Sequence, residues 1–184
     1  MKKWTYDKKK GVLLHDSGEF FHIEGKRITN SEREVKSWDQ PFIKQVGYNG
    51  GIIGLVRANI KGIPHYLVDA KFEPGNYKLI QISPTLQATF SNISRVHKGR
   101  KPKYLDYFIR PDKNNCKVLF KQWMSEEGGR LNYKRNLGML INNTSTAELE
   151  IGDDFIWVTL KQIKELILEN ALINPHLRGM VSFI

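Results

Sequence analysis

The stretch that decides the fold is Ile52-Ile53-Gly54-Leu55-Val56-Arg57-Ala58-Asn59-Ile60-Lys61-Gly62-Ile63-Pro64-His65-Tyr66-Leu67-Val68-Asp69-Ala70. Its first half, residues 52–60, is rich in β-branched residues, and only Gly54 weakens it as a strand. Lys61-Gly62 is a turn signal, after which residues 63–70 resume the apolar pattern. We predict a β-hairpin over residues 52–70.

The segment after the hairpin changes period. Residues 77–82 alternate in the manner of a strand, whereas Ser83 and Pro84 are typical of a helix N-cap and a first helical residue. Apolar side chains at positions 86, 90 and 93, followed by His97, recur at the spacings of one helix stripe. We therefore predict a strand over residues 77–82 and a helix from Ser83 to His97.

Strand and turn signals also flank these segments. They predict strands at residues 12–15, 20–23, 117–123 and 131–141, with turns at Glu24-Gly25 and residues 127–130. Thr159 and Gln162 form a capping box, which predicts a late helix that ends by Asn174-Pro175. Antiparallel strands with one mid-chain and one late helix predict a single α+β domain over residues 1–184.

Composition narrows the class of protein. The 184 residues are 40% hydrophobic and 26% charged, as in an ordinary globular domain. Cys116 is the only cysteine, so no internal disulfide can form. The basic N-terminus is not followed by the apolar run of a signal peptide or a membrane span, and we expect a cytoplasmic protein that does not enter a membrane.

The net charge of +10 raises the question of an anionic partner. The basic residues gather in two runs, at residues 8–10 and 98–103, and neither run shows a helical face with interleaved aromatic residues. We therefore expect a solvated basic surface or a site for a phosphate or pyrophosphate group, and not a nucleic-acid groove.

Polar side chains are densest between residues 71 and 99. This segment holds amides, hydroxyls, the carboxylate of Glu73, the ammonium of Lys71 and the imidazole of His97. Amides and hydroxyls suit a sugar ring, and a lysine beside a helix N-terminus suits a pyrophosphate. The same residues are also good turn and helix-start residues, so physical chemistry alone leaves both readings open.

The same segment carries a family resemblance. Residues 70–76 (Ala-Lys-Phe-Glu-Pro-Gly-Asn), residues 81–89 (Gln-Ile-Ser-Pro-Thr-Leu-Gln-Ala-Thr) and Ser91-Asn92 resemble the signature of the NDP-hexose 2,3-dehydratases. Ordered blocks elsewhere resemble the same family: Trp38-Asp39-Gln40-Pro41 with Gln45 and residues 51–54, then His97-Lys98-Gly99-Arg100, residues 104–108, residues 125–130 and Lys134-Arg135-Asn136. The resemblance covers nearly the whole chain.

This resemblance implies a Nudix-like fold, a mixed β-sheet sandwiched by helices, without Nudix chemistry. The Nudix signature needs a helix with Arg-Glu and Glu-Glu pairs that hold magnesium, whereas Glu126-Glu127 and Asp153-Asp154 lie in turn-like sequence. We therefore expect no metal site and no cofactor. Because relatives of this kind carry two copies of the domain, the resemblance also suggests a homodimer.

The implied substrate is a nucleotide-linked 4-keto-(6-deoxy)hexose, most readily a dTDP-sugar, which loses water across C2–C3 to give a 3,4-diketo-2-deoxy sugar. A ketoreductase is expected to consume this product. The resemblance implies catalytic roles for Glu73, His97, Lys71 and Tyr104. It implies substrate-binding roles for Trp38, Gln45, Asn76, Gln81, Ser83, Thr85, Gln87, Thr89, Asn92, Arg130, Arg135 and Asn136.

Two alternatives to a dehydratase remain at this stage. One is a non-catalytic domain that binds a sugar nucleotide. The other is an isomerase that forms the same enolate from the same 4-keto substrate.

Overall fold

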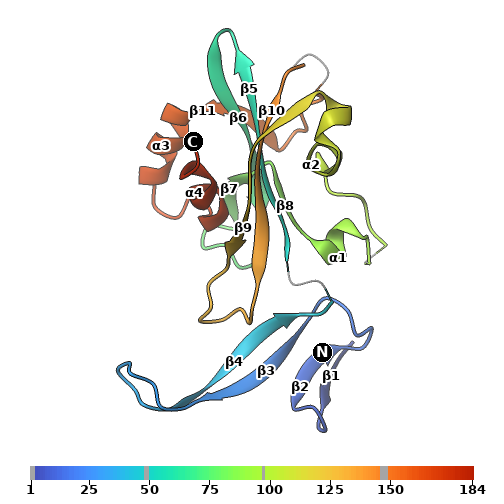
Figure 1. Ribbon diagram of the computed structural model, residues 1–184, viewed down its shortest axis with the longest axis vertical. Coiled ribbons are helices and arrows are strands. Elements are labelled where there is room, and N and C mark those ends of the chain that lie inside the picture. Colours follow the sequence, from blue (N-terminus) through green and yellow to red (C-terminus); the bar gives the residue numbers. More distant parts are fainter. Residues whose placement is uncertain (1–2, 48–49, 97, 146–148) are drawn as a thin grey trace.

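The computed structural model describes residues 3–47, 50–96, 98–145 and 149–184. A four-stranded antiparallel sheet, β1-β2-β3-β4, contains the N-terminal strands, and a seven-stranded mixed sheet contains the rest. In Figure 1 the smaller sheet lies below the larger one, which stands between α3 and α4 on one side and α1 and α2 on the other. The predicted α+β class, with a mixed sheet between helices, is confirmed.

The strands and helices have the following bounds along the chain. The strands are β1 (Trp4–Asp7), β2 (Val12–His15), β3 (Phe21–Ile28), β4 (Trp38–Gln45), β5 (Gly51–Ile60), β6 (Ile63–Phe72), β7 (Ile80–Pro84), β8 (Leu86–Thr89), β9 (Cys116–Ser125), β10 (Arg135–Asn143) and β11 (Phe155–Thr159). The helices are α1 (Phe90–Ile93), α2 (Leu105–Ile109), α3 (Leu160–Leu168) and α4 (Pro175–Val181), with a 3-10 turn at Pro111–Asn114.

Strand β5 is the centre of the larger sheet. It pairs in parallel with β10 and antiparallel with β6 and β8, and nearly all of its residues are buried because helices cover both faces. Gly54 is required in this strand, since a Cβ at that position would lie 2.4 Å from the ring of Phe108 on α2. Gly54, which lowers the strand propensity of this segment, therefore allows α2 to pack closely against β5.

The two strands of the predicted hairpin separate after Val56 and Leu67, and we call this separation, with β7 on one arm and β8 on the other, the fork. Strands β5 and β6 pair from Ile60 and Ile63 as far as Val56 and Leu67, and beyond that point β6 pairs with β7 while β5 pairs with β8. Thr85 sits at the apex, where its buried hydroxyl accepts a hydrogen bond from the Val56 N–H at 2.9 Å and donates one to the Leu67 carbonyl. One side chain thus satisfies two backbone groups that the separation of the strands would otherwise leave unpaired.

The predicted helix from Ser83 to His97 is wrong in its first part. Ser83 and Pro84 end β7, and of the described residues 83–96 only Phe90–Ile93 are helical, with the Thr89 hydroxyl accepting from the Asn92 N–H as N-cap. Leu86 and Ala88 are buried while Gln87 is half-buried, which is the period-two pattern of a strand. Pairing with β5 gives this segment the backbone hydrogen bonds that a helix would have supplied.

Other sequence expectations are confirmed or corrected in detail. The hairpin at Lys61-Gly62 and the capping box of Thr159 and Gln162 are confirmed. The turn at Glu24-Gly25 is wrong, because β3 continues through it and pairs Gly25 with Pro41 of β4.

Three boundaries also move. The strand expected from residue 77 starts at Ile80, and the partner of β9 starts at Arg135 and not at residue 131. Pro175, expected to follow the end of the last helix, instead opens α4 at a position where its missing N–H costs nothing.

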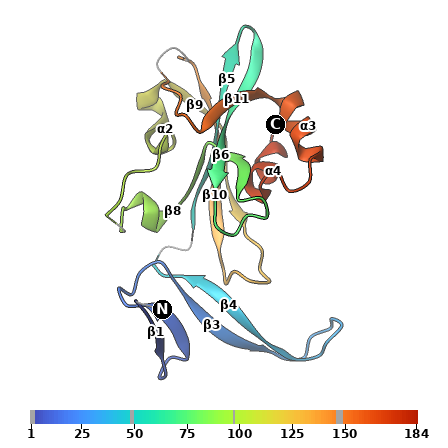
Figure 2. The ribbon, with the colours of Figure 1, turned by 180° about the vertical axis from the view of Figure 1, so that it is seen from behind.

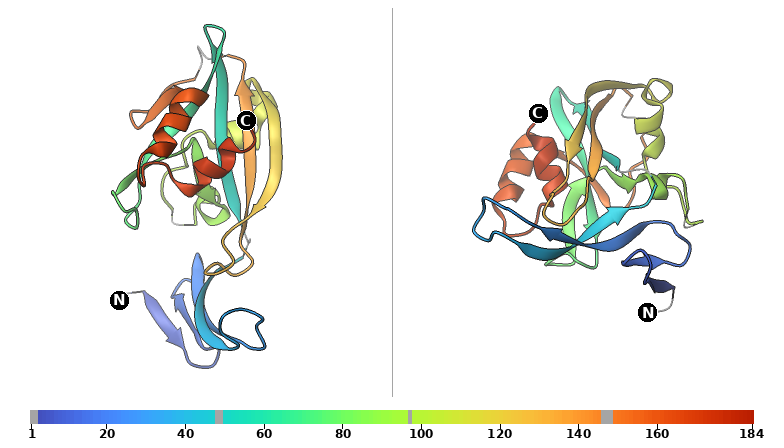
Figure 3. Two further views of the ribbon diagram at one scale, coloured as in Figure 1. Left: turned by 90° about the vertical axis from the view of Figure 1, so that its left-hand side faces the viewer. Right: turned by 60° about the horizontal axis from the view of Figure 1, so that its bottom comes forward.

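The smaller sheet contacts the larger one through the connection between β9 and β10, which we call the 126–134 loop. The Ile43 N–H donates to the Arg130 carbonyl at 2.8 Å, and the Asn132 N–H donates to the Ile43 carbonyl at 2.9 Å. Figures 2 and 3 show this loop reaching the smaller sheet from above. The loop therefore extends the pairing of β4. In the described part of the chain, no helix has the length and apolar character to cross a membrane.

Replacing Thr85 by Val tests the fork. The substitution keeps the shape but leaves the Val56 N–H and the Leu67 carbonyl buried without a partner, at about 1–3 kcal/mol for each group. We expect the free energy of unfolding in urea to fall by about 2–4 kcal/mol. Thr144→Val, which removes an exposed hydroxyl, is the matched control and should cost less than about 0.5 kcal/mol. Equal costs for the two variants would contradict this role of Thr85.

Candidate functional site

Most of the predicted site residues that line a hollow are found in two adjoining ones. The first, here the aromatic hollow, has a volume of about 410 Å³, and the second, here the polar hollow, about 240 Å³. The residues that line both are Thr89, Asn92, Leu131 and Lys134. Because they share these four residues, the two hollows form one groove between the smaller sheet and the fork.

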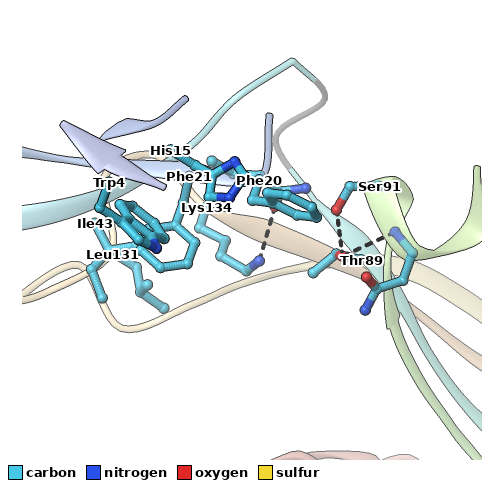
Figure 4. Close-up of a pocket in the computed structure, with 11 residues that line it drawn as sticks. Trp4, His15, Phe20, Phe21, Ile43, Thr89, Ser91, Leu131 and Lys134 are labelled. Carbon is cyan, nitrogen blue, oxygen red and sulfur yellow. Dashed lines mark hydrogen bonds between the residues drawn. The ribbon is translucent and has the colours of Figure 1, made fainter. Parts of the chain in front are cut away.

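The aromatic hollow is built by the smaller sheet. Trp4, His15 and Phe21 come from β1, β2 and β3, and Phe20 and Ile43 complete its apolar wall. The ring of Trp4 lies 5.0 Å from that of Phe21 and 5.5 Å from that of His15, between centroids. Figure 4 shows Trp4 and Phe21 on one side of Lys134, with Thr89 and Ser91 on the other. Such a wall suits the flat face of an aromatic ligand ring.

One wall of the polar hollow comes from the end of β6. Lys71 and Glu73 are two residues apart, so their side chains leave the extended chain on one face, and Nζ of Lys71 lies 3.1 Å from Oε1 of Glu73. Lys71 also donates to the Gln87 carbonyl at 3.3 Å, across the opening between β7 and β8. The fork therefore holds an ammonium beside a carboxylate at the edge of the hollow.

The polar hollow is also lined by a glutamate paired with a histidine. Nε2 of His176 lies 2.9 Å from Oε1 of Glu126, and the same oxygen accepts from Nδ2 of Asn136. These bonds, that from His176 foremost, hold the pKa of Glu126 below its usual range, so this residue is a carboxylate at neutral pH.

His176 is placed by α4. Asn174, the N-cap of this helix, accepts from the Leu177 N–H and donates to Oγ of Ser83 at 2.8 Å and to Oε1 of Gln87 at 3.0 Å. The start of α4 is thereby bonded to both arms of the fork. His176 follows two residues later, at the edge of the polar hollow.

Lys134 stands where the two hollows meet. Its Nζ donates to Oε1 of Gln45 at 2.9 Å, and Nε2 of Gln45 donates to the Gly50 carbonyl at 3.0 Å. Burial lowers the pKa of Lys134. A lysine at this junction can contact a group that lies between a ring in one hollow and a sugar in the other.

A third hollow adjoins the polar one through Lys71 and Gln87. It is also lined by Asp69, Lys103 and Asp154, and burial raises the pKa of Asp69 to about 6. A carboxyl with a pKa raised by burial beside a hollow is a candidate for proton transfer, and no motif in the sequence indicates it.

The structure brings together part of the predicted set. Lys71, Glu73, Gln87, Thr89, Asn92 and Asn136 line the polar hollow, and Gln45 lines the aromatic one. His97 lies outside the described residues.

The remaining predicted residues have other surroundings, and their roles in binding or catalysis stay predictions. Ser83 and Thr85 are buried and bonded within the fork, while Asn76 donates to backbone carbonyls of its own turn and Gln81 donates to the Ala171 carbonyl. Trp38 opens β4 opposite Ile28, and its ring nitrogen donates to Gln40. Tyr104 donates to the Glu150 carbonyl beside a separate hollow, Arg130 pairs with Glu127, and Arg135 lies over the ring of Trp123.

Several lining residues are not predicted as site residues from the sequence, although Glu126 and Lys134 lie in blocks that resemble the family. Trp4, Phe21, Lys134, Glu126 and His176 belong to segments far apart in the chain, and only the tertiary fold brings them to one groove. The Asn174-Pro175 pair is a good helix start and could have indicated α4, but not its position beside β7. Among the described residues, no three His, Cys, Asp or Glu side chains gather closely enough to hold a metal ion.

Comparison with known proteins gives one consistent family. The family model described as NDP-hexose 2,3-dehydratase matches residues 1–184. A dTDP-4-dehydro-6-deoxy-alpha-D-glucopyranose 2,3-dehydratase from Streptomyces violaceoruber is 37% identical over 179 residues, which are 97% of this chain and 39% of that protein. The protein of the same name from Saccharopolyspora spinosa is 36% identical over 184 residues, 100% of this chain and 37% of that protein. The chain thus spans about two fifths of the length of these relatives.

Solved structures give weaker similarities. A Nudix hydrolase from M. smegmatis aligns with a TM-score of 0.44 and 15% identity over 86% of this chain and 97% of that one. The C. elegans Ap4A hydrolase aligns with a TM-score of 0.39 and 9% identity over 73% of this chain and 89% of that one. Similarities of this size carry no argument about the groove.

The lowered pKa of Glu126 predicts a pH-dependent contribution to stability. The folded chain binds fewer protons at this carboxyl than the unfolded chain, so its stabilising effect is complete above the ordinary glutamate pKa, 4.5, and is lost as the pH falls through the folded value. We expect Glu126→Gln to lower the melting temperature at pH 7, where the charge-assisted bond contributes about 1–2 kcal/mol, or about 2–8 °C. At pH 4 and below, the difference from the unaltered chain should shrink. A difference in melting temperature that stays constant between pH 7 and pH 3 would contradict this contribution of Glu126.

Proposed function

This chain belongs to the NDP-hexose 2,3-dehydratase family, and we propose that it removes water across C2–C3 of a dTDP-linked 4-keto-6-deoxyhexose. The observation that carries this proposal is the groove, in which an aromatic hollow adjoins a polar hollow that holds Lys71 and Glu73. Several signature residues line that polar hollow, namely Lys71, Glu73, Gln87, Thr89 and Asn92. Two relatives carry the name of a dehydratase for this substrate.

The groove suggests how such a substrate lies. The flat pyrimidine base suits the rings of Trp4 and Phe21, and the sugar suits the amides and hydroxyls of the polar hollow. The diphosphate would then lie near Lys134, at the junction. This arrangement uses one cation for the phosphates and leaves Lys71 for the reacting sugar.

The reaction requires a base and a group that stabilises an enolate. A carboxylate takes the proton from C3, the electron pair of that C–H bond forms the C3–C4 double bond, and the C4 oxygen becomes negative. In the proposal Glu73 is the base and Lys71 neutralises this oxygen, because the two side chains lie 3.1 Å apart on the same wall. Loss of hydroxide from C2 restores the C4 ketone, and the enol at C3 then gains a proton at C2 to become the 3,4-diketone.

The overall step is neither an oxidation nor a reduction, so no redox cofactor is part of the proposal. The diketone is reactive, and we expect a ketoreductase to consume it. A homodimer stays a proposal as well, and sedimentation of the active chain at micromolar concentration tests it.

Incubation of the chain with dTDP-4-keto-6-deoxyglucose in deuterated buffer containing EDTA tests the function. A dehydratase gives a product that has lost one water and carries a deuterium from the solvent at C2. An isomerase incorporates deuterium at C3 without losing water, and a binding domain leaves the sugar unchanged. Either of the last two results contradicts the proposal, and turnover that requires added magnesium contradicts its metal-independent form.

Glu73→Gln tests the proposed base. The amide keeps the shape and hydrogen bonding but cannot take a proton, so we expect kcat to fall by about 10²–10⁴-fold with little change in substrate affinity by calorimetry. Glu165→Gln, on an exposed part of α3 beside Lys161, is the matched control and should leave kcat unchanged. A fall of less than about threefold would contradict the role of Glu73 and point to Asp69 as the next described candidate.

Lys71→Met separates the two partners proposed for this ammonium. If Lys71 neutralises the enolate oxygen, kcat falls while the dissociation constant of the substrate stays close to that of the unaltered chain. Weaker binding with unchanged kcat would instead assign Lys71 to a phosphate.

A further inference from the structure

The proposed reaction needs a second proton transfer that the Lys71–Glu73 wall does not supply. After Glu73 has taken the C3 proton, the C2 hydroxyl leaves as hydroxide unless an acid donates a proton to it, and hydroxide is a poor leaving group. The acid must reach the sugar from within the same hollow. His176 and Glu126 line the same hollow as Lys71 and Glu73 and have no role in the mechanism described so far.

We infer that His176 is the catalytic acid that protonates the departing C2 hydroxyl, and that Glu126 is the positioning residue that orients it. The inference rests on the proposed function and deepens it. In this step an N–H bond of the imidazolium breaks, an O–H bond forms, the C2–O bond breaks, and water leaves with neutral imidazole remaining.

The hydrogen bonds of the pair support this division of roles. Oε1 of Glu126 is bonded to both Nε2 of His176 and Nδ2 of Asn136, so the carboxylate is fixed on one side by a buried amide and fixes the imidazole on the other. Nδ1 of His176 makes no hydrogen bond to any described residue, which leaves that nitrogen for a ligand. A carboxylate that holds one nitrogen of a histidine, while the other faces the reaction, is an arrangement that sets ring orientation.

The surroundings of the pair favour His176 over Lys134 as the acid. Lys134 is also near Glu126, but its ammonium is bonded to Gln45 at the junction with the aromatic hollow. His176 is further held by the helix cap at Asn174, whose bonds to Ser83 and Gln87 fix the start of α4 against the fork. The side chains of both His176 and Glu126 are about a quarter exposed or less, so each is accessible to a ligand while being held in place.

The test is the partition of the substrate between C3 exchange and loss of water. In deuterated buffer with dTDP-4-keto-6-deoxyglucose, mass spectrometry gives the rate of deuterium entry into recovered substrate and the rate of dehydration. For His176→Asn we expect dehydration to fall by about 10²–10³-fold, while the total rate of C3–H removal, exchange plus dehydration, stays within about threefold. His65→Asn, far from the groove on the β5–β6 hairpin, is the matched control and should leave both rates unchanged.

Two results would overturn the inference. If exchange and dehydration fall in parallel in a folded His176→Asn chain, His176 serves the first proton transfer or the fold, and if neither falls, a single residue such as Glu73 serves both transfers. A wild-type chain that neither exchanges nor dehydrates the substrate would instead refute the proposed function, which keeps the two failures distinct.

Glu126→Gln keeps the inference testable if His176→Asn does not fold. A positioning role predicts the same shift toward exchange, smaller at about 10-fold, as a fall in kcat without a change in KM. A purely structural role predicts a lower melting temperature with the partition unchanged, and that result would also overturn the inference.

Discussion

The hydroxyl of Thr85 makes the pair of hydrogen bonds on which the rest of the structure depends. Two strands of a hairpin cannot separate inside a protein unless the backbone groups freed by the separation find partners, because each would cost about 1–3 kcal/mol. Thr85 bonds one group on each strand, and β7 and β8 pair with the strands below that point. Lys71 crosses the opening between β7 and β8 and lines the polar hollow. The separation of strands that Thr85 stabilises therefore also forms the edge of this hollow.

The fork also explains how residues more than a hundred positions apart share one hollow. Asn174 caps α4 with one end of its amide and bonds Ser83 and Gln87 with the other, so the helix start is defined by the two arms of the fork. Lys71 and His176 are therefore positioned by the same small group of bonds. Ser83 and Thr85 resemble ligand-binding residues in sequence because they belong to this segment, yet their hydroxyls are already bonded within the protein.

The parts of the fold that the sequence predicts are those set by local chemistry. The hairpin at Lys61-Gly62 and the capping box at Thr159 need only neighbouring residues. The helix predicted from Ser83 is wrong as far as Thr89, because residues 86, 90 and 93 fit a helix stripe while the competing strand β8 depends on pairing with β5. In the site, Lys71 and Glu73 could be paired from their two-residue spacing. Trp4, Lys134 and His176 could not, since their meeting depends on how the smaller sheet, the 126–134 loop and α4 pack.

The 126–134 loop connects the two halves of the groove. One end carries Glu126, the other carries Lys134, and the Glu126 N–H donates to the Lys134 carbonyl at 3.0 Å, which closes the loop. Its middle pairs with Ile43 of β4, and Nζ of Lys26 on β3 donates to Asn132 at 2.9 Å. The loop that carries Glu126 is therefore bonded to the same smaller sheet that supplies Trp4 and Phe21 to the aromatic hollow. On the proposed function, one loop thus joins the sheet that would hold the nucleotide base to the carboxylate that orients His176.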